Sequence, residues 1–252
     1  MIRLEGVHKS FGPTQVLNGL DLEVKDGETF VLLGPSGMGK SVLLKHIIGL
    51  LRPDKGRILV DDIDISDLAG NDLVDARKAV GYVFQSGALI NWLTVEENVA
   101  LPLKEHTRMS ALEIRDKVQR MLDLVHLSRD GKKFPDEISG GMRKRVGIAR
   151  ALVLDPTTLL FDEPTTGLDP VRSRSIGSVI AEMSAERERT NIIVTHDLDL
   201  AFDLADRIGF LHGGRIAVVG TPHEIANTDN ATVREFVSGH KPKGKQARPD
   251  RL

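Results

Sequence analysis

The sequence contains no cysteine among its 252 residues. Disulfide bonds and thiolate metal sites are therefore excluded, which fits a reducing compartment. Long hydrophobic runs are also absent: stretches such as IIGLL at 47–51 are far shorter than the roughly 20 residues that cross a bilayer. The opening residues mix charged with apolar side chains and do not look like a signal peptide. We therefore expect a soluble protein that reaches a membrane only through a partner.

The sequence also lacks an excess of either charge. It has 34 Lys and Arg against 36 Asp and Glu, a formal net charge of −2. This balance gives no overall positive field, so nucleic acid is not the expected partner. With 40% hydrophobic and 28% charged residues, the composition is that of an ordinary globular protein. The chain is long enough for one large domain or for a core with a satellite lobe.

Four short runs of β-branched and aliphatic residues predict buried parallel strands. They are almost entirely apolar, which suits a sheet covered on both faces. Helical patterns lie between them, and this alternation predicts an open α/β sheet. The strands are predicted at residues 29–34, 81–84, 157–161 and 191–195, and the helices at 40–51, 68–79, 111–127, 141–154, 171–187 and 197–208.

Other segments indicate how the chain is divided. The opening segment and residues 209–220 alternate like antiparallel strands, and HGG in the second marks a hairpin. Residues from about 86 to 156 carry helical patterns without strand signals, which predicts an inserted helical lobe. The resulting division is a sheet core with an antiparallel β subdomain at 1–87 and 157–222, a helical lobe at 88–156, and a C-terminal helix with a basic tail at 223–252.

Polar residues follow all four predicted parallel strands. The first strand is followed by PSGMGKS, the second by Gln85, the third by Asp162 and Glu163, and the fourth by His196. The carboxyl ends of parallel strands lie along one edge, where open α/β sheets bind their ligands. The sequence therefore predicts a single site on this edge.

The stretch GPSGMGKS matches the phosphate-loop pattern. Glycines let the backbone wrap phosphates, a lysine neutralises the β and γ groups, and a serine hydroxyl can bind Mg²⁺. The alternative is a tight glycine turn, but the strand before and the helix after favour nucleotide binding. The candidate binding residues are Gly34, Pro35, Ser36, Gly37, Met38, Gly39, Lys40 and Ser41.

Two adjacent carboxylates, Asp162 and Glu163, end the third strand. Side chains alternate along a strand, so the two should diverge, one toward a metal and one toward an attacking water. A polar strand cap is the alternative. A second anion-holding place is predicted at Ser139, Gly140 and Gly141, because they precede a helix whose free N–H groups and dipole attract negative charge.

The stretch FDEPTTGLDP at 161–170, with SGG before it and THD after it, resembles the ATP-binding cassette (ABC) ATPases, and the resemblance covers nearly the whole chain. It implies a RecA-like core that binds ATP and Mg²⁺ and hydrolyses ATP. Without the resemblance, Phe11 could equally be a core residue and His196 a loop residue. With it, Phe11 stacks on adenine, Gln85 contacts metal and water, Asp162 and Ser41 support Mg²⁺, Glu163 is the general base, His196 contacts the γ-phosphate and Asp169 lies in the D-loop.

The resemblance also implies why one chain has two anion sites. In the family, Ser139, Gly140 and Gly141 face the γ-phosphate held by a second subunit of a head-to-tail homodimer, so the site is completed only on dimerisation. The family signature LSGGQ reads ISGGM here, with Met142 in place of glutamine. The amide contact is lost, but Ser139 and the backbone N–H groups remain, so we expect hydrolysis to survive.

Residues 84–107 and SGGMRKR are similar to the ATPase of bacterial Mla/Mce-type phospholipid transporters. This similarity implies a dimeric membrane permease, a periplasmic Mce-domain protein and a small STAS-domain protein as partners, with the ATPase on the cytoplasmic face of the inner membrane. Trp92, the only tryptophan, follows Gln85 among aliphatic residues and suits an anchor for the permease. The alternative is that Trp92 belongs to the core of the helical lobe.

Three other functions stay open on the sequence. The first is transport of another substrate. The second is a soluble cassette acting on DNA or ribosomes, which the single cassette and the short spacing between motifs disfavour. The third is a non-hydrolysing regulatory cassette, which Glu163 and His196 disfavour. The basic tail is either a solvated end, an attractor of anionic lipid or a clasp between subunits; its cations are Lys241, Lys243, Lys245, Arg248 and Arg251.

Overall fold

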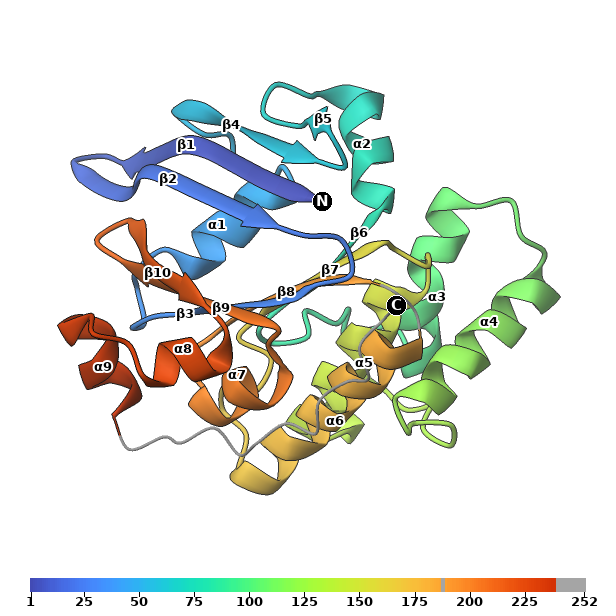
Figure 1. Cartoon of the computed structure of the whole chain (residues 1–252). Coiled ribbons are helices and arrows are strands. Elements are labelled where there is room, and N and C mark those ends of the chain that lie inside the picture. Colours follow the sequence, from blue (N-terminus) through green and yellow to red (C-terminus); the bar gives the residue numbers. More distant parts are fainter. Residues whose placement is uncertain (187–188, 239–252) are drawn as a thin grey trace, which may run out of the picture.

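The computed structural model describes residues 1–186 and 189–238, which form two β-sheets surrounded by helices (Figure 1). The central sheet has the strand order β10-β9-β3-β8-β7-β6. The four predicted strands are confirmed as its neighbouring parallel members β3, β8, β7 and β6. The strands of this sheet are β3 (Thr29–Leu33), β6 (Val80–Val83), β7 (Thr158–Asp162), β8 (Thr190–Thr195), β9 (Arg207–His212) and β10 (Arg215–Gly220).

A second, antiparallel sheet has the order β2-β1-β4-β5, as the alternation of the opening segment predicts. The predicted hairpin is also present, since β9 and β10 pair in antiparallel fashion around Gly213 and Gly214. β9 pairs in parallel with β3 as well, so the hairpin extends the central sheet. The strands of the second sheet are β1 (Ile2–Phe11), β2 (Thr14–Val24), β4 (Lys55–Val60) and β5 (Ile63–Asp64).

The described helices include all six predicted ones, most of which end earlier than predicted. They are α1 (Lys40–Ile47), α2 (Gly70–Lys78), α3 (Val95–His106), α4 (Ala111–Leu124), α5 (Gly140–Leu152), α6 (Pro170–Glu186), α7 (Leu198–Leu204), α8 (Pro222–Ala226) and α9 (Ala231–Val237), with a 3-10 turn at Pro135–Glu137.

Two differences from the predicted helices have clear physical causes. The helix predicted at 197–208 is wrong beyond Leu204, because Asp206 binds the first residue of β3. The Asp206 N–H donates to Thr29 O at 2.8 Å, and the Asp206 carboxylate accepts the Thr29 N–H at 2.9 Å. Helix α3 was not predicted as a separate element. Its start is a capping box in which Thr94 and Glu97 satisfy each other's backbone N–H groups.

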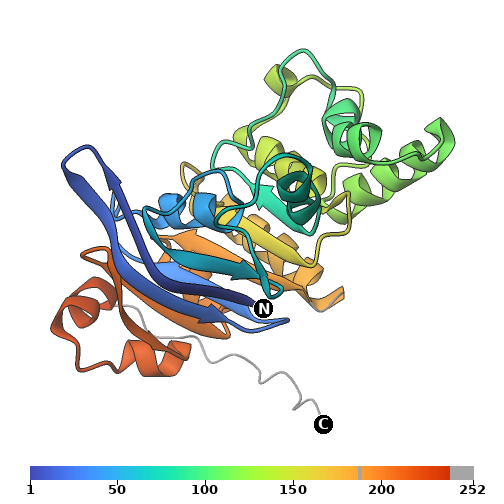
Figure 2. The same cartoon turned by 90° about the horizontal axis from the view of Figure 1, so that it is seen from above.

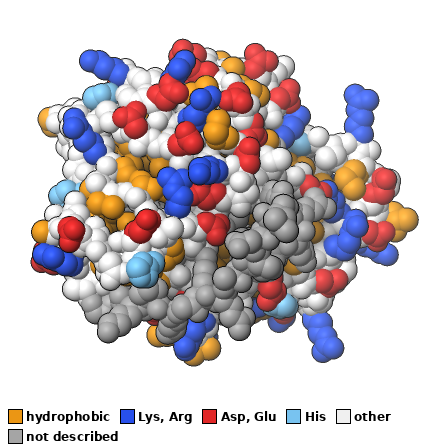
Figure 3. Space-filling model, viewed as in Figure 1, with side chains coloured by type: hydrophobic (Ala, Val, Ile, Leu, Met, Phe, Trp, Pro, Cys, Tyr) orange, Lys and Arg blue, Asp and Glu red, His pale blue; other side chains and the backbone are white. Residues whose placement is uncertain are grey.

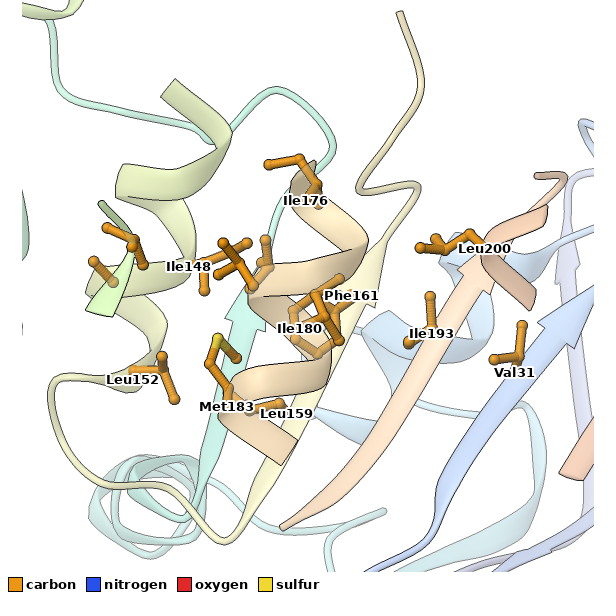
Figure 4. Packing of buried hydrophobic residues seen from close by; sticks show 14 of the residues in the cluster. Val31, Ile148, Leu152, Leu159, Phe161, Ile176, Ile180, Met183, Ile193 and Leu200 are labelled. Atoms are coloured by element: carbon orange, nitrogen blue, oxygen red, sulfur yellow. The ribbon is translucent and has the colours of Figure 1, made fainter. Parts of the chain in front are cut away.

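The central sheet is covered on both faces because its side chains alternate. Phe30 and Leu32 of β3 pack with α1 and the antiparallel sheet. Val31 and Leu33 belong to the opposite cluster, where side chains of β7, α5 and α6 meet (Figure 4). Helices α3 and α4 project to one side, away from β1 and β2 (Figure 2). Because both faces of the sheet are packed in this way, the carboxyl ends of its parallel strands are held in fixed positions relative to one another.

Residues 84–157, between β6 and β7, contain α3, α4, α5 and the 3-10 turn. We keep the domain boundaries at 88, 156 and 223 as a proposal. Within the described residues, no helix has the length and apolar character needed to cross a membrane. On the face drawn in Figure 3, acidic and basic side chains are interspersed. The five cations of the basic tail lie outside the described residues.

His46 is a buried titratable group between α1 and the antiparallel sheet. Its side chain is 0% exposed, and its Nδ1 lies 2.7 Å from the Val42 carbonyl oxygen. A carbonyl only accepts, so Nδ1 carries the hydrogen, while Nε2 has no hydrogen-bond partner among the described residues. Burial lowers the pKa of His46 and the Lys9 charge lowers it further, whereas the backbone groups of Val42 and Arg52 and the Asp54 charge oppose the shift.

We predict that His46 makes the fold less stable in mild acid. The unfolded chain takes up this proton near the ordinary pKa of about 6.5 while the folded chain resists it, so the His46 contribution is present above that pH and is lost as the pH falls below it. The free energy of unfolding in urea should decrease from about pH 7.5 to about pH 5.5 with a slope of up to about 1.4 kcal/mol per pH unit. His46→Leu should remove this part of the slope, and an unchanged slope would refute the assignment.

Candidate functional site

The loop between β3 and α1 is shaped to surround phosphate groups. Gly39 has φ 95°, and a Cβ at this position would lie 2.6 Å from Val16 Cγ1, so only glycine fits. Lys40, 5% exposed, donates from Nζ to the carbonyl oxygens of Gly34 at 2.7 Å and Pro35 at 3.1 Å. The loop thus holds one ammonium group within a curved stretch of backbone.

A hydroxyl and a carboxylate meet beside this loop. Ser41 Oγ donates to Asp162 Oδ1 at 2.6 Å, and the Tyr82 hydroxyl donates to Asp162 Oδ2 at 3.0 Å. Burial and the Asp162 charge raise the pKa of Tyr82, which keeps it a neutral donor. Hydroxyl and carboxylate oxygens are the protein ligands that Mg²⁺ prefers beside substrate phosphates, so Ser41 and Asp162 fit that ion.

Glu163 contacts a different set of groups from Asp162. Its Oε2 accepts hydrogen bonds from His196 Nδ1 at 2.8 Å and Thr166 Oγ1 at 2.9 Å, and its Oε1 lies 3.4 Å from Lys40 Nζ. The predicted divergence of the two carboxylates is therefore present. Its cause is the turn as well as the strand, because β7 ends at Asp162 and Glu163 has φ 49°, a left-handed conformation that is rare outside glycine.

These elements line one groove of about 340 Å³. Phe11 lines it and is 47% exposed, with Lys9 Nζ 5.7 Å from the ring centroid. Gln85 lines the groove as predicted. Four predicted residues are not among the lining residues. The carbonyl oxygens of Gly34 and Pro35 accept from Lys40, and Asp162 accepts from Ser41. The Met38 side chain packs on the hydrophobic cluster below the antiparallel sheet. The lining residues are Phe11, Val16, Ser36, Gly37, Gly39, Lys40, Ser41, Val42, Gln85, Glu163, Thr166 and His196.

The candidates at the start of α5 and α6 lie apart from this groove. Ser139, Gly140 and Gly141 form the start of α5, where Ser139 Oγ accepts the Met142 N–H at 3.3 Å and the Ser139 side chain is exposed. Asp169 caps α6, accepting the N–H groups of Val171 and Arg172 at 3.0 Å. None of the four lines the groove of its own chain.

Sequence reasoning missed Tyr82. The signal is present in the strand register: Tyr82 on β6 lies opposite Leu160 on β7, and Asp162 is two residues further along β7 on the same face. Diagonal neighbours of this kind are within reach of a long side chain. The pairing can be inferred only once β6 and β7 are known to be adjacent.

The fold and groove define a phosphate-loop ATPase of the cassette type, and comparisons with known proteins agree. A family model described as "ABC transporter" matches residues 17–166. The chain belongs to the ABC transporter family, as an ATP-binding subunit with ATPase activity that uses ATP and Mg²⁺.

Two relatives and one solved structure show what this chain is similar to. A probable ribonucleotide transport ATP-binding protein of Mycobacterium leprae is 45% identical over 240 residues, 95% of this chain and 69% of that protein. The intermembrane phospholipid transport system ATP-binding protein MlaF of Haemophilus influenzae is 36% identical over 239 residues, which cover 95% of this chain and 90% of that protein. A cassette solved as a dimer after hydrolysis, with ADP and phosphate, has a TM-score of 0.82 and 35% identity, covering 88% of this chain and 99% of that one.

We predict that Tyr82→Phe weakens the use of Mg²⁺. The change removes a donor to Asp162 and little else, and loss of such supporting hydrogen bonds lowers metal affinity by about tenfold or more. The Mg²⁺ concentration giving half-maximal ATP hydrolysis should rise accordingly, while ATP binding measured in EDTA stays within about twofold. An unchanged Mg²⁺ requirement would mean that Tyr82 does not support the metal site.

Proposed function

We propose that the chain hydrolyses ATP as one subunit of a homodimer that drives phospholipid transport through a membrane permease. One observation carries the hydrolytic part: Lys40, Ser41 and Glu163 line the same groove with Gln85 and His196. That groove contains a phosphate loop, a metal-binding hydroxyl and a carboxylate suited to activating water, which are the groups that phosphoryl transfer to water requires.

Each lining group has a proposed task toward ATP. Phe11 stacks on the adenine, and Lys40 with the loop N–H groups binds the β- and γ-phosphates. Ser41, Asp162 and Gln85 are the proposed Mg²⁺ ligands; the ion, when bound, neutralises charge on the phosphate oxygens. Tyr82 holds the second Asp162 oxygen. These tasks leave Glu163 as the carboxylate that faces the attacking water.

Glu163 is the proposed general base. It orients a water for in-line attack on the γ-phosphorus and takes one proton from it, while the bond from phosphorus to the β,γ-bridging oxygen breaks. His196 and Thr166 hold one carboxylate oxygen, at 2.8 and 2.9 Å, so the carboxylate is fixed before substrate binds. Lys40, 3.4 Å from the other oxygen, stabilises the charge that develops on the phosphate.

A second copy of the chain is proposed to complete the site. Ser139 is exposed at the start of α5 and does not line the groove of its own chain. The N-terminus of α5 presents N–H groups suited to an anion. The related cassette with ADP and phosphate is dimeric, which supports the same assembly here. In a twofold dimer, Ser139, Gly140, Gly141 and Asp169 of each copy then serve the groove of the other.

The loop after Gln85 is the proposed contact with the permease. Trp92 is 79% exposed, so the alternative that it belongs to the core is wrong. The loop is held by fully buried Asn98, whose amide donates to the carbonyl oxygens of Ile90, Leu93 and Thr94 and whose Oδ1 accepts the Ile90 N–H. An exposed tryptophan on a fixed loop is suited to anchoring a partner protein.

Phospholipid is the proposed cargo for two reasons. The chain is similar to MlaF, and its residues 84–107 are similar to the Mla/Mce-type ATPases. The other proposed partners, from the same similarity, are an Mce-domain protein and a STAS-domain protein, with the ATPase on the cytoplasmic face of the inner membrane. Ribonucleotide transport is the second candidate, because the mycobacterial relative named for it is 45% identical. Lipid analysis of the purified complex distinguishes the two.

We predict that Trp92→Ala disconnects the ATPase from its permease. In detergent extracts, the tagged parent chain should recover a membrane permease together with bound phospholipid, and Trp92→Ala should recover at least about fivefold less, since anchor residues contribute about 2 kcal/mol or more. Leu112→Ala, at an exposed leucine on α4, is the control and should recover the permease normally. Recovery of a permease without phospholipid would contradict the lipid assignment.

A further inference from the structure

Lys144 is a buried cation that the groove does not account for. It lies on α5, five residues after Ser139, and is 6% exposed. Its Nζ donates to the backbone carbonyl oxygen of Glu163 at 3.2 Å and forms no ion pair with a carboxylate of the described residues. Burial lowers the pKa of Lys144 and the Glu163 charge opposes that shift. Burying an amine costs free energy. We therefore expect its contact with the Glu163 carbonyl oxygen to have a function.

The Glu163 backbone needs support from its neighbours. Its φ of 49° is unfavourable for a side chain with a Cβ, and such conformations persist only where surrounding contacts hold them. The Glu163 N–H donates to Val194 O at 2.9 Å, and its carbonyl accepts the Thr166 N–H at 3.3 Å. Lys144 supplies the third contact, and it comes from the helical region rather than from the sheet.

Helix α5 also contacts the loop that carries Gln85. Arg150 donates to the carbonyl oxygens of Gly87 and Ala88, both at 2.9 Å. A Cβ on Gly87 would lie 2.8 Å from the Arg143 carbonyl oxygen, so the loop and helix are in direct backbone contact. One rigid helix thus touches the Gln85 loop, the Glu163 turn and, at its N-terminus, Ser139.

We propose that Lys144 is a positioning residue for ATP hydrolysis, which holds the Glu163 turn and connects it to the Ser139 end of α5. This inference rests on the proposed function, in which Ser139 meets the nucleotide of the partner subunit. Binding at the N-terminus of α5 then reaches, through Lys144, the general base of the same chain's own groove. The two composite sites of the dimer are linked by this contact within each subunit.

The test replaces the ammonium and measures catalysis separately from binding. In Lys144→Met, kcat should fall at least about tenfold while the KM for ATP stays within about twofold, because the base is misplaced and the phosphate loop is untouched. Lys144→Arg, which keeps a donor, should recover most of the loss. Lys117→Met is the matched control: it removes a lysine that pairs with Asp155 at 2.6 Å and does not line the groove, and it should keep the parental kcat.

A double-mutant cycle separates positioning from general stability. If Lys144 acts through Glu163, Lys144→Met should change the residual single-turnover rate of Glu163→Gln by less than about twofold. Equal losses in both backgrounds, or a rise in KM with kcat unchanged, would overturn the inference while leaving ATP hydrolysis intact. A parent chain that hydrolyses no ATP would instead refute the proposed function, and the inference with it.

Discussion

The site depends on the turn at the end of β7, where two adjacent carboxylates are directed to different sets of contacts. Asp162 belongs to the strand and contacts Ser41 and Tyr82, whereas Glu163, at φ 49°, contacts His196 and Lys40. Were the strand to continue for one more residue, the Glu163 side chain would lie elsewhere. The strained backbone is held from β8 and α5, so the position of the Glu163 carboxylate depends on contacts from two separate elements.

The packing of the sheet explains why that turn can carry strain. Both faces of the central sheet are buried, one against α1 and the antiparallel sheet and the other against α5, α6 and α7. The phosphate loop, Gln85, Glu163 and His196 follow neighbouring strands, so their relative positions are set by strand register. Helix α5 adds a contact from the helical region to the Glu163 turn, through Lys144.

The sequence predicted what depends on local pattern. The parallel strands are apolar runs, and the phosphate loop has fixed spacing, so both could be found without coordinates. What depends on tertiary contact was missed: the Tyr82 hydroxyl on Asp162 requires strand adjacency, and the end of α7 is set by Asp206 binding Thr29. Trp92 was ambiguous because exposure of a single tryptophan cannot be inferred from its neighbours; it lies 79% exposed. Helix α3 was not predicted, although Thr94 followed by Glu97 three residues later is the sequence pattern of a capping box.

The central claim is that each ATP site is shared between two copies of the chain, and mixing two inactive variants tests it directly. Lys40→Ala disables the phosphate loop and Ser139→Arg disables the helix end, so each homodimer should be inactive. In an equal mixture, about half of the dimers combine the two variants and each contains one intact site, so up to about a quarter of the parental ATPase sites should return. A mixture no more active than the sum of its separate components would contradict the shared site.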